Sequence, residues 1–182
     1  IYRHVWLNKY PNTHIATDGV FAHANINGNK AALMVETTIS NENIYAGNYT
    51  VSTILTDRAG NKTAAAREQN ISLGANGERT VKQQMAVNDP HLWSLNDPYL
   101  YRVLVELKQD GKVIDSKKIR FGFRTVDIKA NGVFLNGKHV KILGTNNHQD
   151  HAGIGSALPD YMQYYRISLL KNMGSNAYRT SH

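Results

Sequence analysis

Segments with the residue alternation of β-strands follow one another through residues 14–129, and no helical periodicity of useful length interrupts them. They span residues 14–25, 31–40, 49–57, 63–73, 79–87, 99–109 and 112–128. Turn-forming residues separate them, as at Asn27-Gly28-Asn29 and Asp110-Gly111. This recurrence predicts an antiparallel β-sandwich for most of the chain.

The clearest hairpin of this region spans residues 99–128. One face of its first strand is predicted to carry Tyr99, Tyr101, Val103, Val105 and Leu107. Asp110-Gly111 supplies the type I′ turn that matches the twist of two antiparallel strands. Seven strands within about 115 residues, closed by such a hairpin, predict a mainly β fold of the immunoglobulin-like sandwich type, without its cysteine pair.

The amino-acid composition excludes several classes of protein. Of 182 residues, 41% are hydrophobic, which is enough for a core, and no apolar run is long enough to span a membrane. The absence of cysteine excludes disulfides, thiolate metal sites and a cysteine nucleophile. We expect a soluble protein, and the compartment stays open between the cytoplasm and the periplasm or exterior.

The net charge of +7 raises the question of a nucleic-acid partner. In the densest basic stretch, residues 117–124, cationic side chains alternate with Ile119, Phe121 and Phe123. Alternation of this kind places the cations on a solvated strand face opposite a core face. We therefore expect neither a nucleic-acid nor a membrane partner.

The pattern changes beyond residue 130. The predicted elements are a hairpin turn at Asn136-Gly137, a strand over 140–143, a polar loop over 144–151, a helix over 159–173 and a strand over 176–182. Strand, helix and strand form one βαβ unit. Ligand chemistry in parallel sheets and barrels gathers at the carboxyl ends of the strands, so residues 146–151 and 179–182 should be neighbours.

The predicted helix has an apolar stripe at Tyr161, Tyr165, Leu169 and Met173. This i, i+4 spacing is typical of a face that packs into a core, and we do not interpret it as a cofactor site. Arg166 lies outside the stripe.

The histidine-rich loop admits three interpretations. His148, Asp150 and His151 could bind a metal, although a short loop offers no further ligand at fixed spacing. The same groups could cap strand ends and satisfy one another's hydrogen bonds. The favoured interpretation is a site for sugar hydroxyls, which need directed donors and acceptors in a concave pocket. Trp93 leaves a similar choice between a sugar-stacking platform and a side chain that seals the sandwich edge.

Four ordered motifs carry a family resemblance. They are Asn136-Gly-Lys-x-Val-Lys, Gly144-x-Asn-x-His-Gln-Asp-His-Ala-Gly-x-Gly, Arg166-Ile-x-Leu-Leu-Lys-x-Met-Gly and Asn176-Ala-Tyr-Arg-x-Ser-His. Together they resemble the start of the catalytic barrel in family 2 glycoside hydrolases, the β-galactosidase and β-glucuronidase group. The segments around Trp93 and Phe121 likewise resemble those bracketing the last two strands of that family's sandwich domain.

The resemblance implies a domain order. Residues 1–13 would be the last strand and linker of a preceding jelly-roll sugar-binding domain, 14–129 the immunoglobulin-like sandwich, and 130–182 the first βαβ portion of a (β/α)8 barrel. It also implies a carbohydrate substrate and allows a homo-oligomer. No cofactor is required, and a bound magnesium or sodium ion is expected on family resemblance alone.

The resemblance further implies substrate-binding roles. Asn146, His148, Asp150 and His151 belong to the first barrel loop, which lines the sugar site of the family. Arg179 corresponds to an arginine that orders the catalytic carboxylates, and His182 to a histidine that contacts the sugar in the transition state. Asn147 and Gln149 stand where many β-galactosidases have arginine and glutamate, which leaves the sugar undetermined.

A retaining glycosidase needs two carboxyl groups about 5 Å apart. No glutamate occurs from Gly111 to His182. We therefore expect no catalytic residue in this chain, and place the general acid and the nucleophile beyond His182. The sequence predicts a part of a retaining, β-galactosidase-like enzyme acting on terminal β-glycosidic bonds. The alternatives are a non-catalytic sandwich module that binds carbohydrate or protein, and a structural spacer.

Overall fold

The computed structural model describes residues 4–181 and divides the chain into two compact units. One unit is Lys9–Thr125. The other combines the N-terminal segment up to Asn8 with the chain from Val126 onward.

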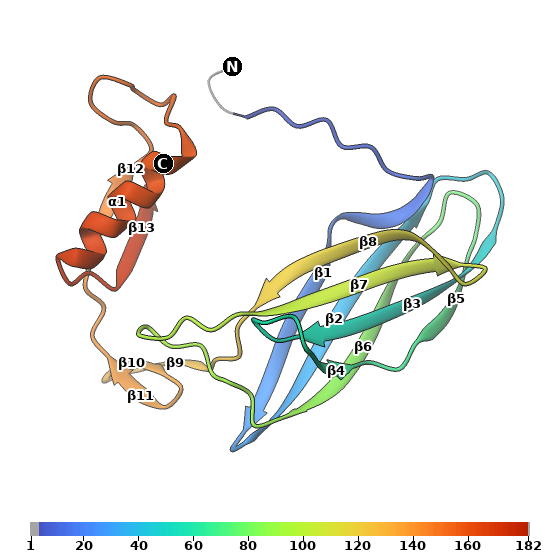
Figure 1. Cartoon of the computed structure of the whole chain (residues 1–182), viewed down its shortest axis with the longest axis horizontal. Helices are drawn as coiled ribbons and strands as arrows, with labels where there is room; N and C mark the ends of the chain where they lie inside the picture. Colours follow the sequence, from blue (N-terminus) through green and yellow to red (C-terminus); the bar gives the residue numbers. More distant parts are fainter. Residues whose placement is uncertain (1–3, 182) are drawn as a thin grey trace. The chain divides into compact units, whose positions relative to one another are not determined.

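The unit Lys9–Thr125 is a sandwich of two antiparallel sheets (Figure 1). The first sheet has the order β1 (Thr13–Asn27), β2 (Lys30–Asn41), β6 (Glu78–Asn88). The second has the order β4 (Lys62–Ala65), β3 (Gly47–Thr56), β7 (Tyr101–Gln109), β8 (Lys112–Phe121), and β5 (Gln69–Leu73) also pairs with β3. The predicted immunoglobulin-like sandwich is confirmed.

The core lies between these sheets, because alternate residues of each strand point inward. β2, for example, has a burial pattern of period two along its whole length. The side chains with no exposed surface include Leu33, Val35, Ile39, Val51, Leu55, Val103, Val105, Leu107 and Phe123. Full burial of one such side chain contributes about 1.5–3 kcal/mol, so this cluster provides the main stabilisation of the unit.

Two predicted strands differ in extent from the observed ones. The segment 63–73 forms two short strands that pair with different ends of β3, β4 beside residues 54–56 and β5 beside residues 47–51. The segment 112–128 leaves the sheet at Phe121. The Trp93 amide donates to the Phe123 carbonyl at 2.8 Å, so the chain after β8 pairs with residues 92–93 instead of β7.

Trp93 lies against the backbone at this edge of the sandwich. A side chain at Gly122 would come within 3.1 Å of the Trp93 Cβ, so the indole lies directly against the backbone there. Trp93 is half-buried, and the Arg124 guanidinium lies 5.0 Å from its ring centroid. This environment favours a packing role over a sugar-stacking platform.

The second unit contains a three-stranded antiparallel sheet of order β11 (Lys138–Val140), β10 (Gly132–Leu135), β9 (Val126–Lys129). The predicted turn at Asn136-Gly137 joins β10 to β11, with φ of 50° and 74°. Asp110-Gly111 has φ of 49° and 75°. Positive φ at both central residues is the type I′ signature, and both hairpin predictions are confirmed.

A parallel βαβ unit follows, made of β12 (Gly144–His148), α1 (Asp160–Asn172) and β13 (Ala177–Ser181) (Figure 1). The strand was predicted over 140–143 but begins at Gly144. Asn176 explains the shift, because its side chain accepts from the Leu143 amide at 2.8 Å and donates to the Lys141 carbonyl at 2.9 Å. The pairing of β12 with β13 therefore begins at the next residue, Gly144.

Helix α1 agrees with the predicted span 159–173, since Pro159 caps its start and Met173 its end. Gly174 follows in the left-handed conformation, with φ of 89°. The predicted core stripe is wrong for this chain, because Tyr161, Tyr165, Leu169 and Met173 are 46–77% exposed. A two-stranded sheet offers too little surface to cover them. The less exposed row is instead Met162, Arg166 and Leu170.

Candidate functional site

The candidate site begins where the two parallel strands β12 and β13 run side by side. Their register aligns Asn146 with Arg179 and His148 with Ser181. The Arg179 Nη1 donates to the Asn146 Oδ1 at 3.1 Å. The structure therefore brings together two predicted site residues that lie 33 positions apart in the sequence.

Gly144 permits this close pairing of the strands. A Cβ at position 144 would lie 3.0 Å from the Ala177 Cβ and closer still to the Ala177 backbone. Any side chain there would push β13 away from β12. The glycine that opens the polar motif thus sets the distance between the two strands that carry Asn146 and Arg179.

The loop after β12 contains Asp150 and His151 and folds into a tight turn. The His151 amide donates to the Gly155 carbonyl at 3.1 Å, and the Gly155 amide donates back to the His151 carbonyl at 2.8 Å. Gly153 and Gly155 adopt φ of 80° and 63°. Leu158, which is 3% exposed, anchors the chain before α1.

Arg166 of α1 connects this loop to the helix. Its Nη1 donates to the His148 carbonyl at 2.8 Å, and its Nη2 donates to the Asp150 carbonyl. The Nη2 also lies 3.3 Å from the His151 Nδ1. His148, Asp150 and His151 are thus gathered around one guanidinium, which leaves the Asp150 carboxylate outside these contacts.

The sequence pattern did not predict the contact of Arg166 with the loop. Arg166 lies outside the apolar stripe of the predicted helix, and an arginine in that position is usually solvated. The available signal was its spacing of four residues from both Met162 and Leu170, the row that the structure buries most. The predicted contact residue His182 lies outside the described residues.

Among residues 4–181, no three or more His, Asp or Glu side chains gather into a group that could hold a metal ion. The His151 Nδ1 lies 3.3 Å from the Arg166 Nη2, so a metal ion at that nitrogen would compete with the guanidinium.

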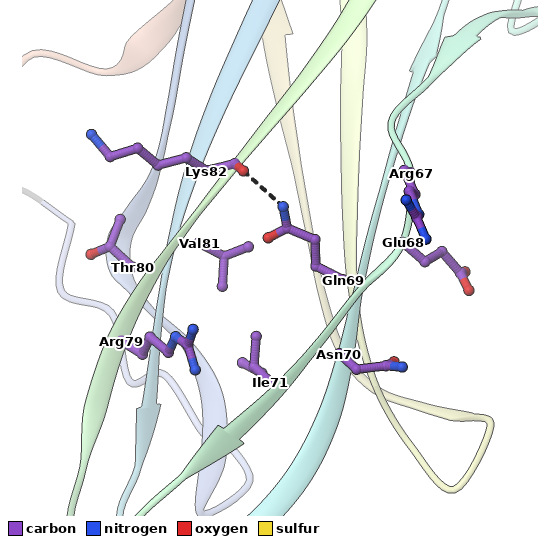
Figure 2. A pocket seen from close by; sticks show the side chains of 9 residues that line it. All are labelled: Arg67, Glu68, Gln69, Asn70, Ile71, Arg79, Thr80, Val81 and Lys82. Carbon is purple, nitrogen blue, oxygen red and sulfur yellow. Dashed lines mark hydrogen bonds between the residues drawn. The ribbon is translucent and has the colours of Figure 1, made fainter.

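One groove of about 570 Å³ lies elsewhere, between β5 and β6 of the sandwich (Figure 2). Ile71 and Val81 are buried beneath it, and Arg67, Arg79 and Lys82 make its rim basic. The Gln69 side chain crosses it and donates to the Lys82 carbonyl at 3.0 Å (Figure 2). None of the predicted site residues lines this groove.

In the described part of the chain, no helix has both the length and the apolar character needed to cross a membrane.

A parallel βαβ unit with polar residues along its strands, as in β12, α1 and β13, is a building block of (β/α)8 barrels and of other parallel α/β folds. The family model for glycosyl hydrolases family 2 matches residues 13–124. The model for the TIM barrel domain of the same family matches residues 126–182. The chain therefore belongs to family 2 of the glycosyl hydrolases.

Curated relatives match the chain from end to end. A β-glucuronidase from Formosa agariphila is 31% identical over 194 residues, which cover 100% of this chain and 20% of the relative. A β-galactosidase from Bacteroides ovatus is 32% identical over 184 residues, which cover 100% of this chain and 22% of the relative. The chain spans about a fifth of the length of these relatives.

Solved structures agree with the fold. A glycosyl hydrolase family 2 member from Bacteroides cellulosilyticus superposes with a TM-score of 0.90 at 34% identity, over 95% of this chain and 24% of that one. A β-glucuronidase from Bacteroides uniformis gives a TM-score of 0.88 at 28% identity, over 95% of this chain and 22% of that one.

Proposed function

We propose that the chain is part of a retaining, β-galactosidase-like enzyme that hydrolyses terminal β-glycosidic bonds in carbohydrates. The observation that carries the proposal is the pairing of Arg179 with Asn146 on adjacent parallel strands of a family 2 barrel segment. A guanidinium beside an amide oxygen, at the middle of the two strands, offers the directed donors that sugar hydroxyls and carboxylates need.

The proposed substrate-binding residues are Asn146, His148, Asp150, His151, Arg179 and His182. Arg179 would order the catalytic carboxylates, and His182 would bond a sugar hydroxyl in the transition state. The general acid and the nucleophile would come from the rest of the protein, because a retaining pair must lie about 5 Å apart and this segment supplies no glutamate after Glu106.

The proposal includes a domain arrangement. Residues 1–13 would complete a preceding jelly-roll domain, 14–129 would form the sandwich domain, and 130–182 would open the barrel. The change from one family model to the next between residues 124 and 126 supports a domain boundary in this region. The match of the barrel model also favours an enzyme over a stand-alone sandwich module.

The proposed activity needs no cofactor. A homo-oligomer and a bound magnesium or sodium ion stay predictions.

Kinetics of the full-length protein test the proposal. Aryl β-galactosides and β-glucuronides would be compared by kcat/KM, because relatives of both names match the chain. Proton NMR of the first-formed product should show retained anomeric configuration. Arg179→Ala should lower kcat/KM about 10- to 150-fold, the loss expected from one charge-assisted hydrogen bond. Absence of turnover on every β-glycoside, in a folded full-length protein, would refute the proposal.

A further inference from the structure

Arg166 belongs to α1, yet every hydrogen bond that the structure gives its guanidinium reaches back to residues 148–151, the last residue of β12 and the loop after it. We propose that Arg166 is a positioning residue for the sugar-binding loop, and that it holds His151 in the tautomer with its proton on Nε2. The consequence for catalysis rests on the proposed function, whereas the tautomer and the loop order do not.

The planar shape of the guanidinium explains why an arginine suits position 166 better than a lysine. Its two terminal nitrogens reach the carbonyls of His148 and Asp150, which lie two residues apart at the end of β12. Arginine has five donors in a rigid planar fork, whereas lysine has a single ammonium group on a flexible stem. A lysine could satisfy one of these carbonyls but would not fix both of them and the imidazole together.

The tautomer follows from donor and acceptor chemistry. The Arg166 Nη2 lies 3.3 Å from the His151 Nδ1, and a guanidinium has no acceptor atom. The Nδ1 must therefore accept, and in the neutral ring the proton is then on Nε2. His151 offers a donor at Nε2, the group that a sugar hydroxyl oxygen can accept from.

The partial burial of Arg166 indicates that its contact with the loop also stabilises the local structure. Helix α1 has no buried residue, and Arg166 is among its few half-buried side chains. No salt bridge joins Arg166 to a carboxylate within residues 4–181. Residues 148–151 supply three acceptors to its guanidinium, and a half-buried cation needs such acceptors.

The loop depends on this connection. Its internal bonds tie His151 to Gly155, and Gly153 and Gly155 add backbone freedom to the unfolded loop. Without Arg166, the described hydrogen bonds from α1 to residues 148–151 are all lost. We expect the loop then to sample several conformations and His151 to sample both tautomers.

The test uses the full-length enzyme that carries this chain, with Arg166→Ala, Arg166→Lys and the control Lys171→Ala. Lys171 is an exposed cation on the same helix. Nitrogen-15 NMR of labelled histidine reports the His151 tautomer, and hydrogen exchange reports the order of residues 148–152. A His151→Gln variant assigns the imidazole signal.

Wild type and Lys171→Ala should show the Nε2–H tautomer and a protected loop. Both Arg166 variants should show mixed tautomers, faster loop exchange and a kcat lowered about tenfold or more. Added ethylguanidinium should restore part of the kcat of Arg166→Ala. Any decrease in the kcat of Lys171→Ala should not be restored by it. An unchanged His151 tautomer in a folded Arg166→Lys protein would overturn the inference. If wild type shows the tautomer and the ordered loop but no β-glycosidase turnover, the proposed function fails and the Arg166 contact stands.

Discussion

Gln83 shows how much one polar side chain contributes to the sandwich. It is 4% exposed on β6, and its Oε1 accepts from the Thr53 hydroxyl at 2.7 Å. Its Nε2 donates to the carbonyls of Val51 and Arg67, at 3.2 and 2.9 Å. A single amide therefore joins the two sheets, and it holds the chain between β4 and β5.

Gln83→Leu should lower the free energy of unfolding by about 2 kcal/mol or more, because it takes a hydrogen-bond partner from a buried hydroxyl and from two carbonyls. Gln84→Leu is the matched control, since Gln84 is the next residue of the same strand and is exposed. Urea unfolding of both variants measures the difference. Equal losses in the two variants would show that Gln83 contributes no more than a surface residue.

His182→Ala, in the full-length enzyme, should lower kcat about 30- to 150-fold and change KM little. A donor that bonds the sugar only in the transition state contributes about 2–3 kcal/mol, and such a contact is seen in kcat. Gln149→Ala should have little effect. Steady-state kinetics with active-site titration, beside a thermal melt, separates this outcome from instability. An unchanged kcat per titrated site would remove His182 from the substrate-binding residues.

The contact between Asn146 and Arg179 was predictable, for a definite reason. Asn146 and Arg179 lie on short strands joined by a helix, and parallel pairing places them side by side whatever their neighbours are. Arg166 was not predictable from the same pattern. Its role depends on which face of α1 turns inward, and an apolar stripe indicates that face only when a core is present to receive it.

At the scale of elements, turn chemistry was the most reliable guide. Asp110-Gly111 and Asn136-Gly137 both form the turns that their residue types predict. Strand limits were less predictable, because side chains distant in the sequence decide them. The Asn176 side chain binds the Leu143 amide, so the β12 ladder begins only at Gly144. Pairing of the Leu92–Trp93 segment with Phe123 takes the chain out of β8.

Gly111→Ala should cost about 1–2 kcal/mol, because an alanine at φ of 75° places its Cβ against its own backbone. Gly74→Ala is the control, since a Cβ at position 74 would meet open space and Gly74 does not adopt a left-handed φ. That substitution should be neutral or slightly stabilising. Thermal unfolding measures both. A loss for Gly74→Ala as large as that for Gly111→Ala would contradict the turn argument.

At the scale of the whole molecule, the two units differ in how well they bury their own surface. The sandwich contains every buried hydrophobic residue of the described chain except Leu158. The barrel segment leaves Ile142, Leu143 and much of α1 exposed. Two strands of an eight-stranded barrel cannot bury both of their faces.

We therefore expect residues 9–125 to fold independently, and the amides of residues 140–143 to exchange quickly in the 182-residue chain. The amides of Val103 and Leu107, which are fully buried on β7, should exchange slowly. Hydrogen exchange with peptide mapping measures both regions in one experiment. Comparable protection of the two regions would show that the barrel segment is stable without further strands.

The 182-residue chain should show no turnover of aryl β-galactosides or β-glucuronides. The carboxylate side chains after Gly111 are Asp115, Asp127, Asp150 and Asp160. Asp160 opens a helix, and the Asp150 carbonyl is held by Arg166. A retaining mechanism needs two carboxyl groups about 5 Å apart, one of them protonated, and we place both on glutamates beyond this segment, which has none after Glu106. Turnover that co-purifies with the chain and disappears in Asp150→Asn would contradict the prediction and make Asp150 a catalytic residue.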